Sequence, residues 1–435
     1  MGRLSREDVI RFSDQYMMTN VARWWKDDPV VIESGKGAIL RDMDGREYID
    51  LHAMHAVASQ GYSHPKIIQA VKEQLEKIFV VATDFYNEPQ ALLAKKLAEV
   101  TPPNLKRSFF VNSGAEAVET ATLLAKRATG RPGIIALWGA FHGRTHMPRT
   151  LTGFSKYKKG MGPFPYGVVH LPNYYCYRCP LGLEYPSCNL QCARMLDDAL
   201  KYAAPEEVAA FIAEPIQGTA GNIVPPPDYF RIVKNILDQY GILFIADEVI
   251  TGFGRTGKLF AIEHFGVEPD IMTMAKALGG GFPVSAAIAS EEVGTAFKPL
   301  DHYSTYGGNP LAMAAALAAI EVIEEENLVE KSAKNGEYML KRLKELMDDH
   351  ELIGEVDGKG LLIGLELVKD RETKEPAVEE TAKFRIELRK RGVIIGPPGW
   401  TGSRIRINPP LVIAKEQIDR AIEAIDEALT VVERE

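Results

Sequence analysis

This chain of 435 residues lacks several sequence features, and each absence argues against a class of function or partner. There is no block of basic residues and the net charge is −8, so nucleic acid is not an expected partner. The longest apolar run, residues 311–320, is too short to cross a bilayer. The first residues also lack the apolar core of a signal peptide, so we expect a cytoplasmic location and no membrane partner. Internal repeats and low-complexity tracts are absent.

The residues that are present are those of an ordinary globular protein. Hydrophobic residues make up 46% of the chain and charged residues 25%, which suffices for a sizeable core. The length predicts roughly two or three structural units.

Strand-like and helix-like segments alternate over much of the chain. The apolar residues 108–111 precede a helical pattern that runs to Gly130, and the amphipathic stretch 227–240 precedes an apolar run at 242–245. Further short strands are predicted at 269–274 and 284–289. This order predicts an α/β core with a mostly parallel sheet and helices on both faces.

The pattern of predicted helices and strands changes after about residue 310. Two long amphipathic helices are predicted at 311–323 and 329–349, followed by a strand at 360–367 and helices at 379–391 and 415–433. Residues 38–50 read as a hairpin around an Asp-Gly turn. We therefore expect a second, small α+β unit.

Lys276 and Asp247 carry the first chemical signal. A lysine amine can form a Schiff base with an aldehyde cofactor, and a carboxylate facing a ring nitrogen keeps that nitrogen protonated. Asp247 ends a strand-like run, and Lys276 follows the next one. Together they indicate a pyridoxal phosphate enzyme, although a lone lysine is usually a solvated surface charge.

A phosphate site and an aromatic platform are also predicted. Ser113 begins a helix directly after a strand and forms a capping box with Glu116, so free N–H groups there can bind an anion or simply cap the helix. Phe141 follows the strand-like run at 134–138 and offers a ring face, or serves only as core.

Seven sequence blocks together resemble the class III aminotransferases. They are residues 112–117 (NSGAEA), 141–145 (FHGRT), 213–218 (AEPIQG), 247–249 (DEV), 252–257 (GFGRTG), Lys276 and 305–310 (TYGGNP). The resemblance implies a pyridoxal phosphate-dependent transferase of fold type I, with a mostly parallel seven-stranded sheet and a small α+β domain built from both termini. It also implies a homodimer with shared active sites, and leaves a higher oligomer open.

The resemblance divides the chain into three parts. Residues 1–60 are the N-terminal segment of the small domain, 61–325 form the large cofactor-binding domain, and 326–435 complete the small domain. A cysteine-containing insertion covers about 172–194 of the large domain.

The resemblance also assigns roles to individual residues. Lys276 is the Schiff-base lysine and Asp247 the partner of the pyridine nitrogen. Phe141 and Val249 pack on the two ring faces, and Thr305 reaches the phosphate from the neighbouring subunit. The full set expected at the cofactor is Ser113, Gly114, Ala115, Phe141, His142, Glu214, Asp247, Val249, Lys276 and Thr305.

Three charged residues are expected to select the substrate. Arg406 matches the arginine that binds an α-carboxylate, and Glu214 the glutamate that pairs with it, although a purely structural ion pair is the alternative. Arg144 matches the arginine used for a far carboxylate in the 4-aminobutyrate branch. The resemblance is closest to the 4-aminobutyrate/ornithine branch and implies transfer from an ω-amino donor to an oxo acid such as 2-oxoglutarate or pyruvate. Amino acid racemases of the same family are the alternative.

Two residues depart from the family pattern. Ile250 stands where the 4-aminobutyrate and ornithine branches usually have glutamine, which leaves the donor open. His55 stands where an apolar pocket residue is expected, so it either lines the donor site or is a core histidine.

All four cysteines lie in one segment. Their spacing is C-x2-C, eight residues, then C-x3-C, at Cys176, Cys179, Cys188 and Cys192. Structural zinc, two disulfides and free thiols all fit this pattern. A cytosolic setting weighs against disulfides. We expect the four cysteines to stabilise the fold locally rather than to take part in catalysis.

Overall fold

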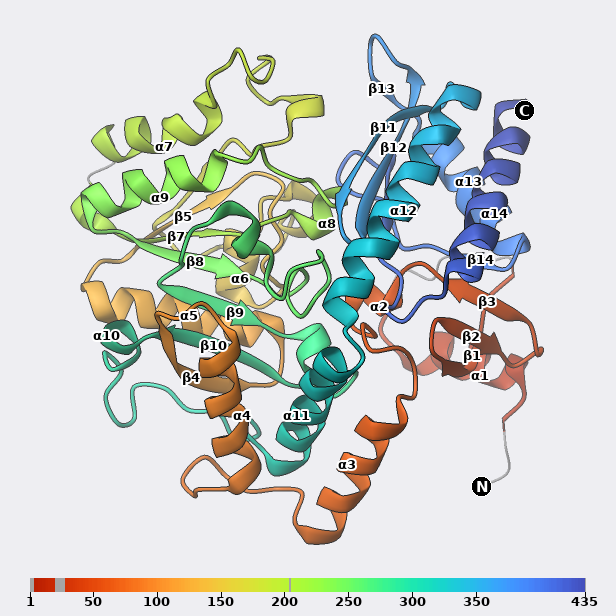
Figure 1. Cartoon of the computed structure of the whole chain (residues 1–435). Helices are drawn as coiled ribbons and strands as arrows, with labels where there is room; N and C mark the ends of the chain where they lie inside the picture. The colour runs from red at the N-terminus through yellow and green to blue at the C-terminus, as the bar shows by residue number, and fades with distance from the viewer. Residues whose placement is uncertain (1–3, 20–27, 203–204, 435) are drawn as a thin grey trace.

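A seven-stranded sheet forms the centre of the computed structural model, which describes residues 4–19, 28–202 and 205–434 (Figure 1). Strand β10 is antiparallel to both its neighbours, and the remaining neighbours are parallel, so the predicted mostly parallel sheet is confirmed. In sheet order the strands are β4 (Leu105–Val111), β10 (Ser285–Ser290), β9 (Ile271–Met274), β8 (Leu243–Asp247), β7 (Val208–Ala213), β5 (Gly133–Leu137) and β6 (Val168–Leu171).

Helices cover both faces of this sheet because successive strand residues point to opposite sides. On β8, Ile245 packs in a cluster with residues of α5 (Gly114–Thr129) and α6 (His146–Leu151). Phe244 and Ala246 point the other way, into the cluster that contains α9 (Tyr229–Tyr240), α7 (Gln191–Tyr202) and α11 (Pro310–Glu325). Strands β5, β7, β8 and β9 are therefore buried on both sides, as their nearly continuous apolar sequences predict.

The two ends of the chain combine into a smaller α+β region, as expected. Strands β1 (Ile32–Lys36), β2 (Ile39–Asp42) and β3 (Glu47–Asp50) form antiparallel pairs, and β3 pairs in parallel with β14 (Val393–Ile394) (Figure 1). A second sheet contains β11 (Ile353–Lys359), β12 (Leu362–Asp370), β13 (Glu375–Pro376) and β15 (Arg404–Ile407). Its helices are α12 (Leu328–Asp349), α13 (Val378–Lys390) and α14 (Lys415–Arg434).

The remaining helices connect these parts. They are α1 (Arg6–Tyr16), α2 (Ala53–Ala56), α3 (Pro65–Lys77), α4 (Glu88–Val100), α8 (Gly218–Gly221) and α10 (Glu291–Gly294). Among the described helices, no candidate for a membrane span is found.

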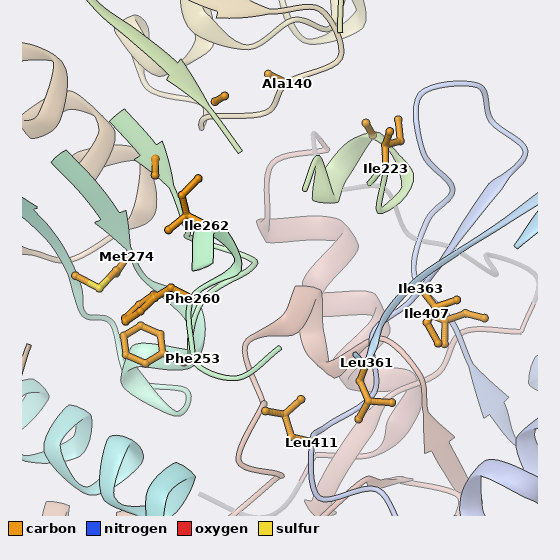
Figure 2. Close-up of a cluster of buried hydrophobic side chains, with 14 of the residues drawn as sticks. Ala140, Ile223, Phe253, Phe260, Ile262, Met274, Leu361, Ile363, Ile407 and Leu411 are labelled. Atoms are coloured by element: carbon orange, nitrogen blue, oxygen red, sulfur yellow. The ribbon is translucent and has the colours of Figure 1, made fainter. Parts of the chain in front are cut away.

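One continuous apolar core joins the large sheet to the smaller one. Figure 2 shows Met274 and Phe260 near the large sheet and Ile363 with Ile407 on the neighbouring strands β12 and β15. All four are buried in the same cluster. The elements that carry the predicted site are therefore fixed to one another by packing.

Candidate active site

A cavity of about 340 Å³ opens where the parallel strands end. The loops after β4, β5, β7, β8 and β9 all contribute to it, which is the usual place for a ligand in an open α/β sheet. Nine of the predicted site residues line it: Ser113, Gly114, Ala115, Phe141, His142, Glu214, Asp247, Val249 and Lys276.

Lys276 lies directly beyond β9 in a strained conformation. Its φ of 42° is in the left-handed region, which a non-glycine residue rarely adopts. Burial lowers the pKa of the Lys276 amine to about 8, whereas the carboxylates of Asp247 and Glu214 oppose this shift. The positive charge of Arg406 also lowers the pKa of Lys276. A substantial neutral fraction near neutral pH makes this amine nucleophilic.

Asp247 ends β8 and is 3% exposed. One carboxylate oxygen lies 2.7 Å from Nδ1 of His142, and the other accepts hydrogen bonds from the Val249 N–H and the Thr273 hydroxyl, both at 3.1 Å. These partners hold a buried acid in place at the cavity wall. Nε2 of His142 is buried and has no hydrogen-bond partner among the described residues.

The start of α5 forms another wall of the cavity. The Ser113 hydroxyl accepts from the Glu116 N–H at 3.3 Å, and Glu116 in turn accepts from the Asn112 N–H at 2.9 Å, so a capping interaction forms as predicted. The free N–H groups of the first turn and the positive end of the helix dipole suit a phosphate. Gly114 is needed here because a Cβ would lie 2.8 Å from Cγ1 of Val249.

Glu214 follows β7 and is held by backbone groups. Its two oxygens accept from the N–H groups of Phe141 and Gly218, each at 2.9 Å. Burial raises the pKa of Glu214 to about 7, although His142 opposes the shift. The expected ion pair between Glu214 and Arg406 does not form among the described residues, and the Glu214 carboxylate lies on these two backbone donors instead.

Arg406 lies on β15 and does not line the cavity, although its charge acts on Lys276. It is 4% exposed, and its Nε donates to the Pro397 carbonyl at 3.0 Å. Burial lowers the pKa of the Arg406 guanidinium to about 10, while Tyr157 and Glu214 oppose the shift. Arg144 is exposed instead, and its guanidinium lies 4.8 Å from the centre of the Tyr157 ring and 5.8 Å from that of Phe141.

His55 lies on an unusual turn. The four residues Ala53, Met54, His55 and Ala56 all have positive φ, between 46° and 65°, a strained run that costs roughly 1–2 kcal/mol per residue. His55 is exposed and makes an edge contact with the His52 ring at 4.2 Å, so it is not a core histidine. Partial burial lowers its pKa to about 4, and Arg406 and Lys276 contribute to the shift.

Ile250 and Thr305, which the sequence also singled out, lie in different surroundings. Ile250 is 9% exposed, lines the cavity and belongs to a small apolar cluster with Ala56. Thr305 does not line the cavity of its own chain and is exposed.

The four cysteines line one small cavity and are all free thiols. Burial raises the pKa of Cys176 to about 12 and that of Cys192 to about 11. Among the described residues, no group of three or more metal-binding side chains is arranged to hold a metal ion. Zinc is therefore not supported, and neither are the two disulfides.

Sequence reasoning missed part of the cavity wall. Val57, Ala275 and residues 281–284 also line it. The three consecutive glycines 279–281 after Lys276 could have indicated that residues 281–284 form part of the wall. Gly280 and Gly281 both have positive φ, which lets the chain turn there. The bond between His142 and Asp247 was not predicted, because it joins loops separated by 105 residues.

The residues of this cavity fit pyridoxal phosphate. A half-buried lysine, a buried aspartate, an aromatic ring and the start of a long helix all face one space. Fold and cavity together define a pyridoxal phosphate-dependent enzyme of fold type I.

Comparisons with known proteins agree. The family described as aminotransferase class III matches residues 21–429. The chain belongs to this family of class III aminotransferases.

Individual relatives cover nearly the whole chain. A leucine/methionine racemase of Thermococcus litoralis is 43% identical over 93% of this chain and 91% of its own length. An acetylornithine aminotransferase of Methanothermobacter thermautotrophicus is 40% identical over 98% and 100%. The structure of an (S)-enantioselective ω-transaminase from Thermomicrobium roseum has a TM-score of 0.93 at 33% identity and covers 99% of this chain and 100% of its own.

Proposed function

We propose that this enzyme transfers the amino group of an ω-amino donor, such as 4-aminobutyrate, ornithine or a derivative of ornithine, to an α-oxo acid. The observation that carries the proposal is the strained, half-buried Lys276, whose pKa is lowered to about 8, in one cavity with Asp247. The 40% identity to an acetylornithine aminotransferase supports the type of donor.

Each wall of the cavity has a part in holding the cofactor. Ser113, Gly114 and Ala115 would bind the phosphate at the helix start, and Phe141 and Val249 would pack on the ring. Asp247 would face the ring nitrogen and keep it protonated. When bound, pyridoxal phosphate supplies an electron sink for the negative charge that develops on the substrate.

Lys276 performs the proton transfers. Its Nζ removes the proton from the amine-bearing carbon of the donor and later returns a proton. A lowered pKa suits both tasks, because the neutral amine is the base and the ammonium group the acid. The apolar side chains of Val249 and Ile250 help to exclude water from the cavity.

Arg406 would bind the α-carboxylate of the oxo acid, since its guanidinium is already buried and a charge-assisted hydrogen bond to it would offset the cost of desolvating the incoming carboxylate. Arg144, whose exposed guanidinium lies over the half-buried rings of Phe141 and Tyr157, would bind a second carboxylate. His55 would line the donor pocket as a neutral side chain. Glu214 would remain on its two backbone donors, or turn toward Arg406 when an ω-amine binds.

Amino acid racemisation is the second candidate. It is favoured by the 43% identity to a leucine/methionine racemase and the 39% identity to an alanine/serine racemase of Pyrococcus horikoshii. Racemisation uses the same lysine and the same electron sink, so the cofactor residues do not distinguish the two reactions.

A homodimer would complete the site. Thr305 is exposed, and large apolar side chains are exposed on two nearby segments, which are in contact through the Tyr303 hydroxyl and Asp84 at 2.9 Å. These side chains are Phe79, Val80, Phe85, Tyr86, Tyr303 and Tyr306. Such a patch is typical of a buried interface, and light scattering that shows a monomer would contradict it. The domain boundaries and the cytoplasmic location stay predictions from the sequence.

The deciding experiment uses the holoenzyme and a panel of donors. 4-Aminobutyrate, ornithine, N-acetylornithine, lysine, β-alanine and several α-amino acids are incubated with and without 2-oxoglutarate or pyruvate. We expect new amino acid to form only when donor and oxo acid are both present. Loss of optical purity of a single amino acid without any oxo acid would instead support racemisation.

A further inference from the structure

The four-cysteine segment (residues 172–194) has no part in the proposed reaction. It nevertheless contacts β15, the strand that carries Arg406, and the neighbouring strand β12. Tyr175 and Arg178 reach from this segment to Glu366 on β12. Lys374 in turn donates from beyond β12 to the Tyr177 carbonyl at 3.0 Å. The segment therefore connects the large cofactor-binding part of the molecule to the smaller α+β region.

Glu366 is the centre of this connection. Its side chain is fully buried, and its carboxylate accepts from the Tyr175 hydroxyl at 2.7 Å and from Nε and Nη2 of Arg178 at 3.0 and 2.9 Å. The Ser403 hydroxyl, just before β15, donates to it at 2.9 Å. A buried carboxylate with this many donors has a well-defined position, and removing one donor is costly.

Arg404 extends the network onto β15. It is 1% exposed, its Nη1 donates to the Tyr175 hydroxyl at 2.8 Å, and its Nε donates to the Gly221 carbonyl at 2.8 Å. The same guanidinium forms an ion pair with Glu355 and lies 5.0 Å from the centre of the Tyr175 ring. Tyr175 thus contacts both β12, through Glu366, and β15, through Arg404.

The strand register couples this network to Arg406. Arg404 is opposite Glu366, and Arg406 is opposite Gly364, two residues further along the same pair of strands. Residues two apart on a strand share a face, so Arg404 and Arg406 project to the same side. A Cβ at Gly364 would lie 2.6 Å from Nη2 of Arg404, which shows how closely the guanidinium is packed. Any shift of Arg404 along β15 therefore displaces Arg406.

We propose that Tyr175 and Arg178 are positioning residues for Arg406, and that the four-cysteine segment is a clamp that fixes the carboxylate-binding strand against the cofactor-binding part of the enzyme. The inference rests on the proposed function, because it takes Arg406 as the group that binds the α-carboxylate.

The test uses Arg178→Met, Arg178→Lys and Tyr175→Phe in the full-length holoenzyme. Arg194→Met is the matched control, because Arg194 is an exposed arginine of the same segment. Among the described residues its hydrogen bond stays within the segment, to the Asn189 carbonyl at 3.0 Å. Calorimetry measures the Kd of 2-oxoglutarate, absorbance measures the affinity for pyridoxal phosphate, and thermal unfolding measures stability. Binding of 2-oxoglutarate does not depend on turnover, so the clamp is tested whether or not the enzyme transaminates.

Arg178→Met should raise the Kd of 2-oxoglutarate roughly tenfold, in line with the sensitivity of such sites to small displacements. Tyr175→Phe should act in the same direction, and Arg178→Lys should recover part of the affinity because it keeps the charge. Affinity for pyridoxal phosphate should not change, and Arg194→Met should resemble the wild type.

Two outcomes would overturn the clamp. One is an unchanged Kd of 2-oxoglutarate in Arg178→Met and Tyr175→Phe. The other is an equal loss of carboxylate and cofactor affinity together with lowered stability, which is the signature of a merely structural role. A wild-type enzyme that binds 2-oxoglutarate but transfers no amino group would refute the proposed function alone.

Discussion

Replacement of Gly114 by alanine tests the shape of the cofactor cavity. Gly114 is the first residue of α5, and an added Cβ would lie 2.8 Å from Cγ1 and 3.2 Å from Cγ2 of Val249. Carbon atoms in contact are ordinarily about 3.5–4.0 Å apart, so Val249 must move by roughly 1 Å. Overpacking of this kind costs about 1–3 kcal/mol, which corresponds to a roughly five- to 150-fold weaker affinity if the strain falls on the bound cofactor.

The assay is titration of the apo-protein with pyridoxal phosphate. Alanine is a better helix former than glycine, so helix propensity predicts no loss of stability in Gly114→Ala. Val249→Ala removes the two methyl groups that the new Cβ would meet, so the double variant should bind the cofactor more tightly than Gly114→Ala alone. An unchanged affinity in Gly114→Ala, or a double variant with additive losses, would refute this account of the cavity wall.

Three further predictions concern charge and thiols. The rate at which the apo-protein binds pyridoxal phosphate should rise with pH, be half-maximal near pH 8 and level off about one pH unit higher, because burial lowers the pKa of Lys276 to about 8 and only its neutral amine is nucleophilic. A pH-independent rate from pH 6.5 to 9 would contradict this. Asp247→Asn should lower kcat at least a hundredfold while the protein still binds the cofactor, since the buried carboxylate acts electrostatically, and a tenfold loss or less would be too small. Thiol titration of the unfolded protein should find four free thiols without reductant and elemental analysis no stoichiometric zinc, whereas two thiols or fewer would show a disulfide.

The sequence predicted the parts of the site that depend on local order. Ser113, Asp247 and Lys276 each follow a predicted strand, and parallel strands bring their carboxyl ends to one edge. The mostly parallel sheet also followed from the alternation of elements, whereas the seven strands and the small region from both termini were implied by the family resemblance.

Side-chain partners were harder to predict, because they depend on how distant segments pack. Glu214 was expected to pair with Arg406, but its carboxylate accepts from two backbone N–H groups instead. The left-handed turn that exposes His55 contains no glycine, so the sequence does not indicate it. The contacts of Arg178 with Glu366 span 188 residues, so no local pattern reveals them.

The central claim is that Lys276 is the residue to which the cofactor attaches. Borohydride reduction of the purified holoenzyme, followed by proteolysis and mass mapping, tests it directly. The account predicts a single modified peptide that carries the reduced cofactor on Lys276, and none in Lys276→Ala. A cofactor attached to any other lysine, or an equally modified Lys276→Ala, would contradict it.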